Sequence, residues 1–244
     1  MIPKTIHYCW FGRKPLPALA IKCIESWKKY LPDYTIKEWN EDNFNVDIIP
    51  YTQEAYNVKK YAYVSDYARF KVLHDEGGIY LDVDVEVLKP LDSLLTNKAF
   101  AGFETDSMVN PGLILGAEKE DKLIKDILDR YNNKSFILSD GSFNYETVVV
   151  HMTNILVEKG LLLNGKLQTI SGLTIYPSDY FSPKSFETDK INITKNTYTI
   201  HHYAASWVPR YMQLEKKIWN LLNLKNRYFL ARFVAKIKKI KSKI

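Results

Sequence analysis

The pattern of apolar and polar positions changes its period between residues 60 and 90. Apolar residues recur at spacings of three and four from Tyr61 to Leu73, which predicts a helix. Gly77 and Gly78 follow, and glycines at this place end a helix. Positions 79–88 then alternate between apolar and polar residues, which predicts one strand. One face of that strand would be aliphatic, and the other would carry Tyr80, Asp82, Asp84 and Glu86.

The acidic face of this strand has the residue types of a cation site. Asp82 and Asp84 would lie about 6.5 to 7 Å apart along a regular strand, close enough for both to reach one hydrated cation. An isolated Asp-x-Asp is also common on amphipathic strands, so its surroundings decide its meaning.

The preceding helix adds polar groups to this acidic strand. Asp66 and Arg69 are three residues apart and Ser65 and Arg69 are four apart, so the three can share one helix face. An Asp-Arg pair on a helix is often a solvated surface pair. Next to an acidic strand, however, arginine and carboxylate together suit a substrate that carries both hydroxyls and phosphates.

The same reading predicts elements on both sides of this region. Residues 2–11 and 34–39 are typical of strands and residues 18–30 of an amphipathic helix, so the chain begins with a parallel Rossmann-like unit. Further along, helices are expected at 122–132 and from about Asn144 to Leu156, a strand carrying two histidines within 197–207, and strands at 99–104, 113–117 and 173–176.

Composition limits the class of protein. At 244 residues, with 46% hydrophobic and 14% aromatic residues, the chain can form one domain with a large core and is not disordered. Its two cysteines, Cys9 and Cys23, give no disulfide framework and fit a reducing cytoplasm. No apolar stretch is long enough to cross a membrane and no signal peptide is evident, so we expect a protein that is not exported.

The charge is divided unevenly along the chain. Residues 216–244 contain ten of the 34 Lys and Arg and no acidic residue, whereas the rest of the chain is slightly acidic. This distribution argues against a nucleic-acid-binding core. Apolar residues in the same segment recur at helical spacing, which predicts a basic amphipathic helix or tail at 213–244 that contacts a membrane surface, or packs on a domain formed by 1–212.

The central region resembles a known signature. The run Ser65-Asp66-x-x-Arg69, followed by Gly77-Gly78-x-Tyr80-x-Asp82-x-Asp84, is similar to the sugar-binding region of DXD-containing glycosyltransferases. Its relatives include yeast outer-chain mannosyltransferases, bacterial capsule and lipopolysaccharide sugar transferases and, more distantly, the glucosylating domains of large clostridial toxins. The resemblance implies an α/β GT-A fold, a Rossmann-like mixed sheet flanked by helices. It also implies a nucleotide-sugar donor and a divalent cation, Mn²⁺ or Mg²⁺.

The resemblance also implies roles for individual residues. Asp84 would bind the cation directly, and Asp82 would reach the ribose or bridge through water. Trp10 would stack on the nucleobase, with Phe11 and Asn40 as further nucleotide contacts. The donor sugar and diphosphate would contact Ser65, Asp66, Arg69, Tyr80, Ser206 and Trp207. The catalytic or acceptor side would carry Asn110, Asn144, Glu146 and His201.

A third protein ligand for the cation is expected from two adjacent histidines. His201 and His202 face opposite sides of a regular strand, so only one of them can join the two aspartates. GT-A enzymes that resemble this chain supply a histidine followed by an aromatic, any residue and a small residue. The run beginning at His202 fits that pattern better, with Ala205 where relatives commonly have Gly, so the sequence favours His202.

The function implied is transfer of a hexose or N-acetylhexosamine from a UDP-sugar, with retention, to a glycan or lipid-linked glycan. The expected setting is bacterial capsule or lipopolysaccharide synthesis in the cytoplasm, at the inner face of the plasma membrane. An inverting enzyme would need a placed carboxylate base, for which Glu146 is the candidate. The alternatives are a metal-dependent phosphoesterase, which needs more clustered ligands than this chain offers, and a non-enzymatic membrane-binding protein.

Overall fold

Strands and helices alternate from the first residues of the chain. The structure, a computed structural model, describes residues 1–185 and 188–204. The helical segments described are α1 (Ala18–Tyr30), α2 (Pro50–Asn57), α3 (Tyr61–Glu76), the short 3₁₀ helix η1 (Asp92–Leu94), α4 (Lys122–Asp129), α5 (Val148–Glu158) and α6 (Ser178–Phe181). The strands are β1 (Thr5–Cys9), β2 (Thr35–Trp39), β3 (Gly78–Tyr80), β4 (Val85–Val87), β5 (Ala99–Thr105), β6 (Met108–Val109), β7 (Leu115–Ala117), β8 (Gln168–Ile170), β9 (Leu173–Tyr176) and β10 (Thr199–His201).

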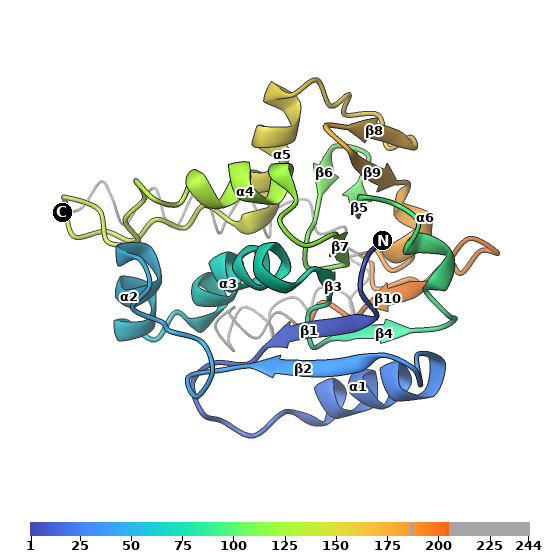
Figure 1. Cartoon of the computed structure of the whole chain (residues 1–244), viewed down its shortest axis with the longest axis horizontal. Helices are drawn as coiled ribbons and strands as arrows, with labels where there is room; N and C mark the ends of the chain where they lie inside the picture. The colour runs from blue at the N-terminus through green and yellow to red at the C-terminus, as the bar shows by residue number, and fades with distance from the viewer. Residues whose placement is uncertain (186–187, 205–244) are drawn as a thin grey trace. The chain divides into compact units, whose positions relative to one another are not determined.

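A mixed sheet lies at the centre of the described part of the chain. Its strand order is β2-β1-β3-β7-β5-β9-β8, with β6 paired to β5 (Figure 1). Strands β2, β1 and β3 are mutually parallel, as the predicted strand-helix-strand start requires. Strand β7 runs antiparallel to both of its neighbours, so the sheet is mixed rather than fully parallel. Because β1 and β3 are parallel, the residues that follow both strands meet at one edge of the sheet.

Helices cover both faces of this sheet. Trp27 and Ile24 of α1 pack with Ile6 of β1 in one core cluster. The apolar side chains of α3, α4 and α5 form a second cluster on the opposite face. Helices α1 and α3 are labelled in Figure 1. The predicted α/β architecture is therefore confirmed. None of the helices within the described residues combines the length and apolarity needed to span a bilayer.

The strand predicted at 79–88 is divided in two. Strand β3 ends at Tyr80, residues 83 and 84 form a turn, and β4 then pairs with β10 in a separate two-stranded sheet. The N–H of Val85 donates to the carbonyl of Asp82 at 3.0 Å and closes this turn. Alternation of apolar residues does not distinguish one long strand from two short strands joined by a turn. Asp82 and Asp84 consequently lie around a turn, not along one strand face.

Helix α5 begins later than its sequence suggested. It starts at Val148, and the hydroxyl of Thr147 accepts a hydrogen bond from the N–H of Val150, as an N-cap does. Asn144 and Glu146 therefore lie in the connection before the helix. The predicted basic helix at 213–244, together with Ser206 and Trp207, lies outside the described residues.

Candidate metal and donor-binding site

Three potential metal ligands meet where β3 and β10 end and β4 begins. Ligand atoms of Asp82, Asp84 and His201 all lie within 4.8 Å of one another. His201 Nε2 is 3.0 Å from a carboxylate oxygen of Asp84, and both residues are buried. Two carboxylates and an imidazole are ligand types suited to a divalent cation such as Mn²⁺, so these residues fit a metal site.

The turn between β3 and β4 and the ladder between β4 and β10 produce this arrangement. His201 is in register with Val85, and the N–H of His202 donates to the carbonyl of Asp84 at 3.0 Å. The two histidines therefore face opposite sides, as predicted. The sequence favoured His202 as the ligand, but the structure places His201 beside the aspartates. His202 Nε2 instead lies 2.8 Å from Glu86 Oε2.

A charged network connects helix α3 to the ligand Asp82. Arg69 is 4% exposed and binds Asp66 at 2.8 Å, and its second guanidinium nitrogen lies 3.4 Å from Asp82. The guanidinium also stacks 4.7 Å from the ring centre of Tyr80, whose hydroxyl donates to Asp82 at 3.0 Å. The Asp66–Arg69 pair is thus buried and not a solvated surface pair. Ser65 lies on the same helix, and its hydroxyl donates to the carbonyl of Tyr61.

The environment of Asp66 favours its protonated form. Burial raises the pKa of Asp66 to about 7, although the adjacent Arg69 opposes that shift. The N–H of Val148, at the start of α5, also donates to this carboxyl and favours its charged form. The start of helix α5 therefore lies beside Asp66.

Gly112 contacts Asp82, and Asn110 in turn contacts Gly112. The N–H of Asp82 donates to the carbonyl of Gly112, and the N–H of Gly112 donates to the side-chain oxygen of Asn110 at 2.7 Å. A Cβ at position 112 would lie only 2.1 Å from a carboxylate oxygen of Asp82. A residue larger than glycine would therefore displace the carboxylate of Asp82. The pattern of apolar and polar residues around position 112 did not predict this close approach.

A hollow of about 310 Å³ lies where β1 and β2 end. Residues at its lining include Trp10, Arg13, Lys14, Glu38, Asn40 and Asp42. Trp10 is half-buried, and its indole N–H donates to the carbonyl of Lys14. Asn40 donates to the carboxylate of Glu38. Phe11, by contrast, is buried edge-to-face against Phe44, so the structure places it in the core.

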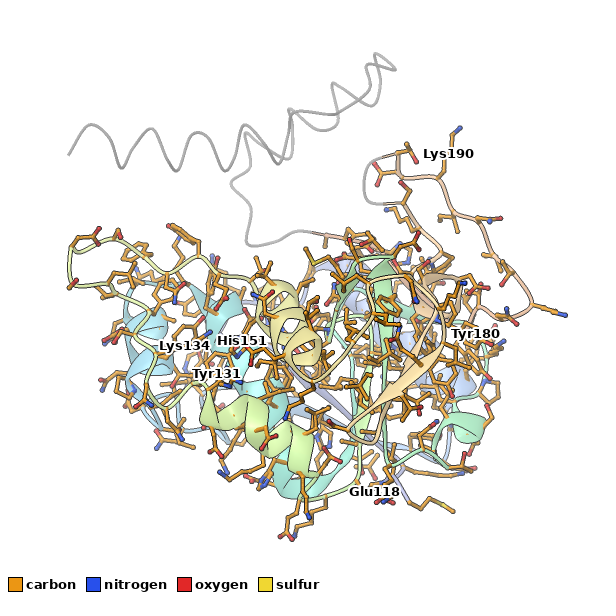
Figure 2. All side chains as sticks on the ribbon, turned by 90° about the horizontal axis from the view of Figure 1, so that it is seen from above. Glu118, Tyr131, Lys134, His151, Tyr180 and Lys190 are labelled. Carbon is orange, nitrogen blue, oxygen red and sulfur yellow. The ribbon has the colours of Figure 1, made fainter. Side chains whose placement is uncertain are left out.

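Glu146 forms an ion pair with Lys134. Lys134 Nζ lies 2.5 Å from Glu146 Oε2 and 2.7 Å from His151 Nδ1. Tyr131 packs edge-on to His151, and Figure 2 shows Tyr131, Lys134 and His151 gathered beside α5. His151 is therefore a packed helix residue, and Nδ1 of its neutral ring accepts a hydrogen bond from Lys134.

His151 is expected to make the protein less stable in mild acid. Burial lowers its pKa to about 4 from 6.5, so between these pH values the unfolded chain binds a proton that the folded chain excludes. Stability should fall as pH decreases through this window, by about 3 kcal/mol in total. Urea unfolding at pH 7 and pH 4.5 should show a smaller loss for His151→Asn, which cannot take up the proton. Equal losses for both proteins would contradict this assignment.

Comparison with known proteins agrees with the geometry of the site. Residues 17–101 match the family described as "Glycosyltransferase sugar-binding region containing DXD motif". A glycosyltransferase of Acanthamoeba polyphaga mimivirus is 26% identical over 225 residues, which cover 86% of this chain and 85% of the relative. The initiation-specific alpha-1,6-mannosyltransferase of Candida albicans is 26% identical over 130 residues, 48% of this chain and 32% of that protein.

A solved structure supports the fold. The PaToxG glycosyltransferase superposes with a TM-score of 0.50 at 19% identity, over 65% of this chain and 70% of its own. At this identity the likeness concerns the fold, which is the predicted GT-A fold. The predicted class of enzyme, a nucleotide-sugar-dependent glycosyltransferase, is confirmed by the family match. The phosphoesterase and the non-enzymatic alternatives receive no support from these comparisons.

Proposed function

We propose that this chain, whose residues 17–101 match the DXD-containing sugar-binding region of glycosyltransferases, transfers one hexose or N-acetylhexosamine from a UDP-sugar to a glycan or lipid-linked glycan. The observation that carries the proposal is the cluster of Asp82, Asp84 and His201 beside the buried pair of Asp66 and Arg69. A cation site next to hydroxyl- and phosphate-binding groups suits the diphosphate and the sugar of such a donor.

The cation would be held by Asp82, Asp84 and His201 and is Mn²⁺ or Mg²⁺ in this proposal. When bound, it would offset the negative charge that grows on the departing diphosphate. The chain itself supplies the fixed position of the ligands. Gly112 leaves room for the carboxylate of Asp82, while the hydroxyl of Tyr80 and the guanidinium of Arg69 hold that carboxylate from the other side.

Arg69 and Asp66 would orient the donor sugar. In this proposal Asp66 bonds sugar hydroxyls and Arg69 contacts a phosphate oxygen, with Ser65 nearby on the same helix. Their low exposure and their contacts with each other and with Asp82 hold both groups in one geometry, and fixed geometry lowers the barrier to reaction. Trp10 would stack on the nucleobase in the hollow beside Asn40, at the sheet edge where ligands of open α/β sheets bind.

We propose retention of configuration at the anomeric carbon. The bond from this carbon to the diphosphate oxygen breaks, a bond to the acceptor hydroxyl oxygen forms, and the acceptor proton is released. Inversion would need a free carboxylate base, and Glu146 is engaged with Lys134. That pairing favours retention.

The donor has one specific competitor. The Candida albicans relative and two Schizosaccharomyces pombe relatives are named as mannosyltransferases, which makes a mannose donor such as GDP-mannose the second candidate. This chain spans only about a third of their length. Capsule or lipopolysaccharide assembly at the inner face of the plasma membrane, with contact through residues 213–244, is the proposed setting.

The test is donor turnover by the purified protein. We expect metal-dependent hydrolysis of one UDP-sugar in a panel of UDP-, GDP- and CDP-sugars, measured by release of the nucleoside diphosphate with Mn²⁺ and with EDTA. Turnover confined to GDP-mannose would replace the UDP donor by the second candidate. If no nucleotide sugar were bound or hydrolysed with Mn²⁺ present, the proposed function would be wrong.

A further inference from the structure

The short strand β4 is fastened along both of its edges. On one edge it pairs with β10, with Val87 opposite Thr199 and Val85 opposite His201. On the other edge, side chains of α1 replace a neighbouring strand. The indole N–H of Trp27 donates to the carbonyl of Val85 at 2.7 Å, and the hydroxyl of Ser26 accepts from the N–H of Val87 at 2.9 Å. These bonds fix the backbone that follows Asp84.

A chain of three charged or polar side chains crosses the same ladder. His202 Nε2 lies 2.8 Å from Glu86 Oε2, and Lys22 of α1 donates to the same oxygen at 3.1 Å. The side chains of His202 and Glu86 are 18% and 20% exposed, so their contact is largely shielded from water. Because side chains alternate along a strand, Glu86 and His202 share the face opposite to His201. The His202–Glu86–Lys22 chain therefore lies outside the cluster of potential metal ligands.

The backbone of His202, like its ring, makes hydrogen bonds to neighbouring residues. Its N–H donates to the carbonyl of Asp84 at 3.0 Å, and its carbonyl accepts from Lys184 Nζ at 2.9 Å. One residue thus touches the backbone of one potential ligand, Asp84, and is covalently next to another, His201. Strand β10 contains only three residues, and His202 directly follows the last of them.

We propose that His202 is a positioning residue of the metal site. Its bond to Glu86, which Lys22 supports from α1, fixes the end of β10 so that His201 presents its Nε2 atom beside Asp84. This inference rests on the proposed function, because it assumes that Asp82, Asp84 and His201 bind a divalent cation. The role is physical preorganisation, in which partners of the ligands hold them in the binding geometry before the cation arrives.

The competing assignment makes His202 itself a ligand. That would require its ring to leave Glu86 and cross to the other side of the β4–β10 ladder. The ligand role and the positioning role of His202 predict different effects of a glutamine at position 202. The amide nitrogen of glutamine can donate to Glu86 as His202 Nε2 does, whereas a glutamine is a poor substitute for an imidazole ligand.

The experiment is Mn²⁺ titration of the full chain, followed by electron paramagnetic resonance of the free ion. We expect His202→Ala to weaken the Mn²⁺ dissociation constant by about 10- to 100-fold, the usual effect of removing a partner that orients ligands. His202→Gln should stay within about threefold of the wild type because it keeps the bond to Glu86. His201→Ala should abolish measurable binding. His74→Gln, a change at a histidine remote from the site, should have wild-type affinity.

A double-mutant cycle separates positioning from general destabilisation. Adding Glu86→Ala to His202→Ala should weaken Mn²⁺ binding little further, because both changes break the same contact. Wild-type affinity in His202→Ala would overturn the positioning role while leaving the metal site intact. A His202→Gln protein as weak as His201→Ala would make His202 a ligand and would also overturn it. A wild type that binds no Mn²⁺ would overturn the proposed metal site and the positioning role together.

Discussion

Replacing Asp84 with asparagine is expected to lower metal-dependent donor turnover by about 10³-fold and to remove tight Mn²⁺ binding. Asp84 is buried in the turn after β3, where its carboxylate faces His201 at 3.0 Å. Asparagine keeps the shape of the side chain but removes its negative charge, so the change isolates the charge. Turnover of the donor and the Mn²⁺ dissociation constant should be measured on the same protein preparation.

A matched control for Asp84→Asn is available at the end of α3. Asp75 is 45% exposed in an ion pair with Lys71, and surface pairs of this kind contribute little. Asp75→Asn should therefore keep wild-type turnover. If Asp84→Asn were as active as this control while remaining folded, the carboxylate of Asp84 would have no role in catalysis or metal binding.

Replacing Arg69 with methionine is expected to destabilise the protein by about 3 to 5 kcal/mol and to remove donor turnover. Methionine fills a similar volume but leaves Asp66 without its cation and Asp82 with one contact fewer. The result is a buried carboxyl that has lost the arginine paired with it. Urea unfolding gives the stability, and donor binding at low temperature, where the variant stays folded, gives the functional effect.

The deficit of Arg69→Met should grow as pH rises. Burial already raises the pKa of Asp66 to about 7 in the wild type, and removing Arg69 raises it further. In the wild type, stability falls with increasing pH only from 3.8 up to about 7, whereas in the variant it continues to fall above pH 7 because the folded state still holds the proton there. Unfolding at pH 5 and pH 8 should show the trend. Arg130→Met, at an exposed pair with Glu158, is the control and should cost little at either pH.

Local periodicity predicted the elements whose burial follows from their own sequence. The helix at Ala18–Tyr30 and the strand at Leu173–Tyr176 have the predicted bounds, because each has an apolar face that a single neighbouring layer covers. The carboxylates, the charged pair on α3 and the histidine strand could also be singled out from residue type and spacing. The resemblance to a family assigned these residues to one metal and donor site.

Contacts between distant residues decided what the sequence could not show. The break after Tyr80 depends on the hydrogen bond from Asp82 to Gly112, and Gly112 lies outside the segment 79–88 from which one strand was predicted. The burial of Asp66 and Arg69 depends on the start of α5, more than seventy residues later in the chain. Which histidine faces the aspartates depends on the pairing of β10 with β4 and on the turn at Val83 and Asp84, because a continuous strand would direct the Asp84 side chain to the side of His202.

In the proposed function, Asp82, Asp84 and His201 hold a divalent cation for the donor diphosphate. The most direct measurement is anomalous diffraction from crystals soaked with Mn²⁺ and UDP. We expect one strong anomalous peak that contacts Asp84 and His201 Nε2 and lies beside Asp82, next to the diphosphate of the nucleotide. A peak bound by His202 and Glu86, or a nucleotide bound with no metal at the aspartates, would contradict it.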